Sequence, residues 1–307
     1  MRKILLSITL LGFLSAAQSQ QLHYMSQYLQ HNVMYNPAAA GMAQNSRVGL
    51  AYRSMWSSFP GNPKTTLVYG DIKSESLNAG IGAYLYKDET GPTSRTGAQL
   101  AYSYHINMND ETNHLAVGLE LRGLQYSVNK TALSAEESLG TTDPAAIGAE
   151  SKFVVDGGAG VYFTNNKISL GVSGTQLLGN NVKLVDYDSS TLSGKLYRQF
   201  NFMASYKLQT GDDIYLMPNA MLRVIENAPT ECDLGVLLNY HDKLWWAMNW
   251  RVRQSWSLQA GLKLLKQLRA TYSYDYYVSP VSVFTNGSGG HEIGLQFDLK
   301  NKNKNND

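Results

Sequence analysis

The chain has 307 residues, of which 43% are hydrophobic and only 16% are charged, and its formal net charge at pH 7 is +2. This balance excludes an extended nucleic-acid surface, which needs clustered positive residues. Beyond the N-terminus there is no run of about eighteen apolar residues, which excludes a transmembrane helix. The single cysteine, Cys232, cannot form an internal disulfide, and we interpret it as a small hydrophobic residue of a strand.

Residues 1–19 have the pattern of a signal peptide. Arg2 and Lys3 precede an apolar core at 4–14, and the small residues Ala17 and Ser19 suit cleavage before residue 20. We therefore predict an exported protein. Removing two of the 26 basic residues leaves 24, equal to the 24 acidic residues of the chain, so the mature protein is near neutral.

The segment 20–46 fits neither a regular helix nor a strand. It contains Ser26-Gln27-Tyr28 and, further along, Asn36-Pro37-Ala38-Ala39-Ala40-Gly41. A proline biases the residue before it away from the helical region, so Asn-Pro favours a turn. The alanines and the glycine predict a patch that another surface can approach closely, and the segment offers no catalytic group.

From Arg47 onward the dominant sequence period is two. Phe200, Phe202 and Ala204, for example, alternate with Asn201 and Met203, which is typical of a strand with one apolar and one polar face. Most such segments have ten residues or more, whereas strands in soluble sheets most often have about five to six. We predict strands near 47–54, 64–73, 78–87, 94–107, 114–126, 152–164, 167–176, 197–208, 213–224, 230–240, 243–253, 255–265, 267–277 and 290–299.

These strands predict an all-β protein, an antiparallel up-and-down transmembrane β-barrel of about 14 strands at 47–299. A soluble sandwich has the same alternation. Two features favour the barrel: about nine to eleven tilted residues cross a bilayer, and 20 tyrosines with 5 tryptophans suit membrane interfaces. The tail 300–307, rich in lysine and asparagine, is predicted to be disordered.

The predicted connections differ between the two ends of the barrel. Those at 127–151, 177–196 and 278–289 are long, whereas those at 165–166, 211–213 and 241–242 are tight turns. Outer-membrane barrels have short periplasmic turns and long external loops. We therefore expect a bacterial outer-membrane protein with both termini in the periplasm, in contact with outer-membrane lipid.

The polar faces of the strands predict a charged lumen, which serves either as a polar network or as a pore lining. A lumen of fourteen strands is wider than the side-chain-filled lumen of about eight strands, so we predict that residues 20–46 fold into the periplasmic mouth as a plug. Asn36–Gly41 would then pack against Gly80, Gly82 and Gly118. The predicted lumenal polar residues are Glu120, Arg122, Lys207, Asn249, Arg251, Lys263, Arg269, Asp275 and Glu292.

No motif predicts an enzyme. The chain has no Gly-x-Ser-x-Gly turn, its six histidines lack zinc-site spacing, and the acidic stretch 186–190 lacks the calcium-loop spacing. Ser103 and His105 share one strand face, but an outer-membrane phospholipase needs such a pair to face lipid. We therefore predict no catalytic residue, no cofactor and no metal.

Four sequence features together resemble the PorP/SprF family of outer-membrane proteins of the type IX secretion system. They are Met25-Ser26-Gln27-Tyr28, the stretch Asn36–Gly41, an early strand with Tyr52-Arg53-Ser54 and Trp56, and the closing stretch Gly289–Leu295. The resemblance spans essentially the whole mature chain. Ala39 and the tail beyond the last strand depart from the family pattern.

The resemblance implies a non-enzymatic role in secretion or in cell-surface anchoring of a large adhesin-like cargo, including cargo used in gliding motility. It implies that the outer loops bind the C-terminal domain of that cargo, and that periplasmic type IX components are further possible partners. An outer-membrane pore for a small solute is the alternative, and a lipid hydrolase is a third.

Overall fold

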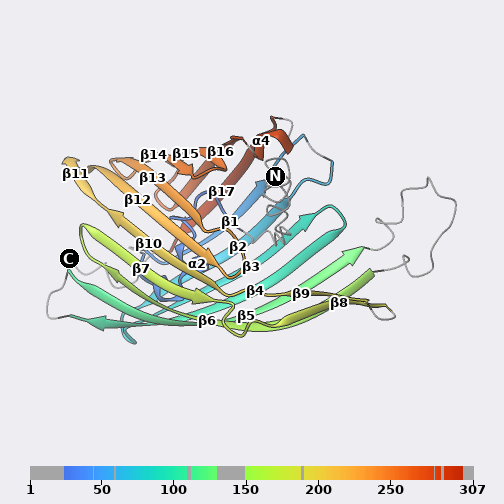
Figure 1. The fold of residues 1–307 in the computed structure, drawn as a ribbon. Helices are drawn as coiled ribbons and strands as arrows, with labels where there is room; N and C mark the ends of the chain where they lie inside the picture. The colour runs from blue at the N-terminus through green and yellow to red at the C-terminus, as the bar shows by residue number, and fades with distance from the viewer. Residues whose placement is uncertain are drawn as a thin grey trace, which may run out of the picture.

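The computed structural model describes residues 24–43, 45–58, 60–108, 112–129, 149–187, 190–279, 281–284 and 287–299 (Figure 1). The predicted signal peptide at 1–19, most of the long connection at 127–151 and the tail 300–307 lie outside the described residues.

The strands form one closed antiparallel barrel. Each strand pairs with its neighbour in the chain, β17 pairs with β1, and β10 and β11 are two parts of one interrupted strand that both pair with β12, which gives fourteen strands around the barrel. The predicted fold class is confirmed. The bounds are β1 (Arg47–Ser54), β2 (Lys64–Ser74), β3 (Ala79–Thr90), β4 (Thr93–Asn107), β5 (His114–Asn129), β6 (Ala149–Thr164), β7 (Ile168–Thr175), β10 (Gln199–Tyr206), β11 (Leu208–Gly211), β12 (Ile214–Ile225), β13 (Glu231–Tyr240), β14 (Leu244–Arg251), β15 (Ser255–Lys263), β16 (Leu268–Tyr277) and β17 (Gly290–Asp298).

The pairing of the first and last strands defines the two ends of the barrel. Arg47 at the start of β1 lies opposite Asp298 at the end of β17, and Ser54 lies opposite His291. We call the end with Arg47 and Asp298 the terminal rim and the opposite end, with Ser54 and Gly290, the loop rim. An even number of antiparallel strands brings the first strand's start and the last strand's end to the same rim.

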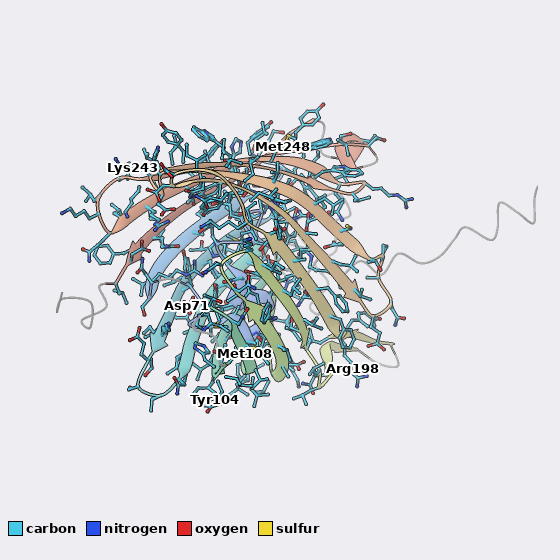
Figure 2. All side chains as sticks on the ribbon, turned by 90° about the vertical axis from the view of Figure 1, so that its left-hand side faces the viewer. Asp71, Tyr104, Met108, Arg198, Lys243 and Met248 are labelled. Carbon is cyan, nitrogen blue, oxygen red and sulfur yellow. The ribbon has the colours of Figure 1, made fainter. Side chains whose placement is uncertain are left out.

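The side chains are distributed inversely to those of a soluble protein. Leu119 and Leu85 point outward and are 67% and 60% exposed, whereas Asn201 and Glu292 point inward and are fully buried. Figure 2 shows Asp71 inside the ring of strands and Tyr104 and Met248 on its outer surface. An apolar exterior around a polar interior is what a lipid-embedded barrel requires, so the soluble sandwich is wrong. Among the described residues, no helix is long and apolar enough to cross a membrane.

Connections at the terminal rim are short. At the β13–β14 turn, His241 and Asp242 both have positive φ, at 52° and 51°, and the Lys243 amide donates to the Tyr240 carbonyl at 3.1 Å, which is the arrangement of a type I′ turn. At the β6–β7 turn, the Asn165 side chain accepts hydrogen bonds from the backbone amides of Lys167 and Ile168, at 2.9 and 2.7 Å. Asparagine side chains bond nearby backbone in this way and stabilise turns.

Two described connections at the loop rim contain regular structure that the sequence did not predict. The connection at 177–196 contains a hairpin, β8 (Asn181–Tyr187) and β9 (Ser190–Lys195), which is a separate two-stranded sheet. The connection at 278–289 contains α4 (Val281–Phe284). Strands β5 and β6 pair from His114↔Thr164 to Asn129↔Ala149 and extend with the hairpin beyond the other strands (Figure 1). Pairing between neighbouring strands therefore continues where a loop was expected.

Residues 24–43 lie inside the barrel and are called the lumenal segment below. The segment includes the short helix α2 (Asn32–Tyr35) and the 3-10 turn η1 (Pro37–Ala39), and Figure 1 shows α2 within the ring of strands. Ala38, Ala39 and Ala40 are fully buried. They form the main hydrophobic core together with wall residues such as Leu67 and Tyr84.

Candidate functional site

The lumenal segment runs through the barrel from the terminal rim toward the loop rim. Gly41 lies beside Gly80 and Ile72, near the turn that joins β2 and β3. At its other end, Tyr24 contacts Arg53 and Arg251, which occupy the loop-rim ends of β1 and β14. The sequence predicted a segment confined to the mouth near the termini. The segment goes deeper because the polar partners of its first residues are at the far ends of the strands.

The end of the segment nearer the terminal rim packs directly on wall glycines. A Cβ atom added to Gly80 would lie 2.0 Å from the Ala40 carbonyl oxygen, and one added to Gly118 would lie 2.3 Å from the Ala38 amide nitrogen. At Gly82 an added Cβ would lie 2.5 Å from Val33 Cγ1 and 3.4 Å from Ala40 Cβ. The predicted contact with these three glycines is confirmed. A fourth contact, between Gly160 and Asn36, was not predicted.

Replacing Gly80 by alanine is expected to displace the lumenal segment, because the new methyl group would overlap backbone atoms of Ala40 that cannot rotate away. Overpacking of this kind destabilises by about 1–3 kcal/mol. Limited proteolysis of the folded barrel should then cleave the segment at least about fivefold faster, which corresponds to the lower bound of that range. Gly70→Ala is the matched control, since its Cβ would meet Val48 at an ordinary 3.7 Å. Equal cleavage rates in the two variants would contradict the prediction.

The turn at Asn36-Pro37 is stabilised by its own side chain. Asn36 Oδ1 accepts a hydrogen bond from the Ala38 amide at 3.0 Å, which caps η1. Pro37 occupies the first position of the turn, where a backbone amide would have no partner within the turn, so the lack of an N–H in proline costs nothing there. The Asn36 side-chain amide also donates to the carbonyl of Val161 in β6 at 3.0 Å. One residue therefore fixes both the shape of the turn and its attachment to the wall.

Further hydrogen bonds attach the segment backbone to the wall. Tyr35 O accepts from Ser173 Oγ at 2.6 Å and from Asn201 Nδ2 at 2.9 Å. The Gly41 amide donates to Asp71 Oδ1 at 2.6 Å. Backbone groups that would otherwise be unsatisfied in the barrel interior thus find partners in β2, β7 and β10.

Ser103 and His105 are part of this attachment. Ser103 Oγ donates to the Ala40 carbonyl at 2.6 Å, and His105 Nε2 lies 2.9 Å from the same oxygen. Both side chains point into the lumen and contact the segment, so the pair does not face lipid as the hydrolase hypothesis required.

Near the loop rim, Arg53 binds two carboxylates and the segment at once. Its Nη2 lies 2.6 Å from Asp275 Oδ2 and its Nη1 lies 3.1 Å from Glu292 Oε2, and Nη1 also donates to Ser26 Oγ. Ser26 in turn donates its hydroxyl to Asp275 at 2.6 Å and its amide to Glu292 at 2.7 Å. Since Arg53 is 1% exposed and Glu292 is 0% exposed, each charge depends on the others for compensation.

Tyr24 lies among three guanidinium groups, an arrangement we call the Tyr24 cage. The Cζ atoms of Arg251, Arg53 and Arg223 are 3.7, 4.6 and 5.1 Å from the centre of its ring. Arg251 is paired with Asp233 at 2.7 Å. An aromatic face attracts cations, so this one ring joins three strands of the wall, β1, β12 and β14.

Gln27, Tyr28 and His31 are buried in the part of the lumenal segment between Ser26 and α2. Tyr28 donates its hydroxyl to Asn219 Oδ1 at 2.5 Å, and the backbone amide of Gln27 donates to Glu292 Oε1 at 3.3 Å. His31 lies 4.0 Å from Glu292, but burial and the nearby Arg47 lower the pKa of His31 to about 3. At neutral pH His31 is therefore uncharged, and Arg53 is the cation that balances Glu292.

The other predicted lumenal residues lie elsewhere in the barrel. Asn249 is buried beside Gly235, and Lys207 Nζ lies 4.2 Å from the centre of the Tyr215 ring. Arg122 binds Glu120 at 3.1 Å and donates to the carbonyl of Met34 in the segment at 3.3 Å. Arg269 binds Asp298 at 3.0 Å at the terminal rim, where the half-buried Lys263 also lies. Sequence reasoning did not single out five wall residues that contact the segment: Asp71, Asn201, Asn219, Arg223 and Gln259. It also did not single out Asp233, which pairs with Arg223 and Arg251. All six are buried at inward-facing strand positions that alternation indicates.

Two cavities flank the lumenal segment. The terminal-rim cavity has a volume of about 260 Å³ and is lined by Tyr28, Leu29, Tyr215 and Trp245 among others. The loop-rim cavity has a volume of about 390 Å³, and Tyr24 forms part of its wall together with residues of the connections at that rim. The segment and these cavities are the candidate functional site.

Solved structures with the same fold include two hydrocarbon transport proteins. The toluene transporter TbuX of Ralstonia pickettii is similar with a TM-score of 0.52 and 10% identity, over 87% of this chain and 93% of TbuX. The monoaromatic hydrocarbon channel CymD gives a TM-score of 0.52 and 10% identity, over 88% of this chain and 93% of CymD. At this identity the similarity concerns the fold alone.

No curated protein sequence matches this chain. The family described as "Type IX secretion system membrane protein PorP/SprF" matches residues 17–297, which include the lumenal segment and all the strands of the barrel except the last residue of β17. The resemblance noted in the sequence is therefore confirmed, and the chain belongs to the PorP/SprF family of type IX secretion system membrane proteins.

Proposed function

We propose that this protein is a non-enzymatic outer-membrane barrel that supports secretion or surface anchoring of a large adhesin-like protein, by binding the C-terminal domain of that cargo at the loop rim. Family membership and the fourteen-stranded barrel support a role in type IX secretion. The short turns at the terminal rim and the long connections at the loop rim support an orientation with the loop rim outside the cell and the terminal rim in the periplasm.

The observation that carries the proposal is the attachment of the lumenal segment to the wall. It forms hydrogen bonds or ion contacts with β1, β2, β7, β10, β16 and β17, among others. A wide barrel with its interior occupied in this way is suited to hold a partner at its outer surface. We infer that the segment acts as a plug that keeps the membrane sealed while the partner is bound. We also infer that periplasmic components of the secretion machinery have access to the terminal rim.

A pore for a small solute is the alternative function. TbuX is described as a toluene transporter and CymD as a monoaromatic hydrocarbon channel. The present chain shares their fold, with only 10% sequence identity to each. A pore requires the lumenal segment to leave or rearrange. Single-channel currents through the intact protein, without any partner, would favour this alternative.

Purification from native envelopes tests the cargo role. A tagged barrel extracted in mild detergent is expected to retain one secreted protein with a type IX C-terminal domain, identified by mass spectrometry. The control is a barrel that lacks the β8–β9 hairpin and its connections, residues 177–196, which should retain less of that protein if the loop rim carries the contact. A barrel that always purifies alone would contradict the proposal.

A further inference from the structure

We propose that the loop-rim cavity binds an extended peptide segment of a secreted partner, which inserts one aromatic side chain and accepts hydrogen bonds through its backbone carbonyl groups. The inference rests on the proposed function, because the cargo supplies the peptide. It adds a defined site and a ligand chemistry to a contact that otherwise involves only the loops.

The size and walls of the cavity suit an aromatic side chain. Its volume of about 390 Å³ lies within the range of about 300–1,000 Å³ that is usual for ligand sites. Much of its wall is apolar or aromatic, with Tyr24, Trp56, Pro63, Ile225, Pro229 and Tyr277. An aromatic ring buried against such a wall gains both apolar burial and ring–ring contact.

Two hydrogen-bond donors in this wall lack acceptors. Neither the Trp56 indole nitrogen Nε1 nor the Tyr277 hydroxyl has a hydrogen-bond partner among the described residues, and Tyr277 is only 5% exposed. Buried donors are usually satisfied, and an unsatisfied one calls for an explanation. Because an indole N–H donates but does not accept, a ligand group that satisfied Trp56 would have to be an acceptor.

The charges around the cavity select a neutral acceptor. Asp88, Glu231 and the exposed Arg253 line it. Both carboxylates already have partners: Asp88 accepts from Thr65 Oγ1 at 2.9 Å, and Glu231 lies 2.7 Å from Arg223. An incoming carboxylate would meet two like charges against the single guanidinium of Arg253. A backbone carbonyl carries no net charge, and an extended peptide presents one at each residue, so a peptide satisfies both donors without that repulsion.

Trp56 has a strained backbone conformation, which costs conformational energy. Trp56 has φ of +50°, a region that bulky residues rarely adopt and that is typical of functional sites when it occurs. Hydrogen bonds on either side hold it there, from the Met55 amide to Pro63 O at 2.9 Å and from the Ser57 amide to Gly289 O at 3.2 Å. Its ring centre lies 6.2 Å from that of Tyr277, which keeps the two donors in one wall.

Binding of defined peptides to the purified full-length barrel tests the site. The probes are acetylated and amidated pentapeptides of glycine and serine with phenylalanine, alanine or glutamate at the centre, and their affinities are measured by calorimetry. The phenylalanine probe is expected to bind most tightly and the glutamate probe most weakly. Equal affinities for the phenylalanine and alanine probes would overturn the proposal.

Conservative variants isolate the two donors. Trp56→Phe and Tyr277→Phe keep an aromatic ring and remove one donor each, so each should weaken the phenylalanine probe about 3- to 10-fold, as expected for one hydrogen bond. Trp250→Phe changes a tryptophan that is 37% exposed on the outer wall and should leave affinity unchanged. Full affinity in both donor variants, with the barrel folded by circular dichroism, would contradict the assignment.

A blocked cavity separates this inference from the proposed function. Ala228 lines the cavity, and Ala228→Trp should fill it and abolish probe binding. If cargo co-purifies with the wild-type barrel and equally with Ala228→Trp, the proposed function stands and the cavity is not its site. If no cargo co-purifies but the wild type binds the phenylalanine probe and Ala228→Trp does not, the peptide site stands and the cargo role fails.

Discussion

Replacing Arg53 by alanine is expected to lower the free energy of unfolding by about 3–5 kcal/mol, the usual effect of removing one partner from a buried ion network. The variant would leave Asp275 and Glu292, which are 1% and 0% exposed, without the guanidinium that lies 2.6 and 3.1 Å from them. It would also remove the hydrogen bonds from Arg53 to Ser26 and Tyr24, so the N-terminal end of the lumenal segment should detach first.

Urea titration of the barrel in lipid vesicles, followed by tryptophan fluorescence, measures this effect. Lys87→Ala is a matched control, because Lys87 forms an equally short bridge of 2.6 Å to Glu89 but both side chains are more than half exposed. Exposed pairs contribute about 0–1 kcal/mol. If both variants lost a similar amount of unfolding free energy, burial of the Arg53 network would not be the source of its stabilising effect.

A triple variant separates loss of an interaction from burial of uncompensated charge. Arg53→Met with Asp275→Asn and Glu292→Gln removes all three charges together. Replacing a buried ion network by groups of similar shape is often close to neutral, so this variant is expected to recover most of the stability that Arg53→Ala loses. If the triple variant is as unstable as the single one, the ion pairs themselves provide the stability.

Deleting residues 20–41 is expected to convert a closed barrel into one that conducts ions. The deletion removes the buried residues from Tyr24 to Gly41 that fill the interior, including Val33, Ala38 and Ala40 at 0% exposure, whereas the wall itself closes by strand pairing alone. A lumen of this width without its filling approaches that of open barrels of about sixteen strands. Planar-bilayer recordings should show discrete open currents for the deletion and quiet membranes for the intact protein.

Adding the missing segment back gives the control for this experiment. A synthetic peptide of residues 20–41, applied to the side of the terminal rim, should reduce the currents of the deletion variant, whereas the same peptide with Asn36 and Ser26 replaced by alanine should act less well. A deletion variant that inserts as a folded barrel and remains closed would contradict the plug role of the segment.

Strand alternation together with strand length predicted the barrel from the sequence. A strand between lipid and a polar lumen has one environment per face, and it needs about nine to eleven residues to cross the bilayer. Phe200, Asn201, Phe202 and Met203 alternate in sequence, and their side chains alternate between exposed and buried in the structure. The small residues Ala38, Ala40 and Gly41 indicated close packing on wall glycines, since only small groups permit it. These features depend on local spacing, which a sequence displays directly.

The partners inside the lumen were decided by the tertiary structure. Ser26 meets Asp275 and Glu292 across sequence separations of 249 and 266 residues, because barrel closure brings β1, β16 and β17 side by side. Alternation places a side chain on the inner face but does not say at which depth or beside which residue it lies. The path of the segment to the loop rim, the Tyr24 cage and the loop-rim cavity therefore follow from barrel closure and strand register, which no local pattern encodes.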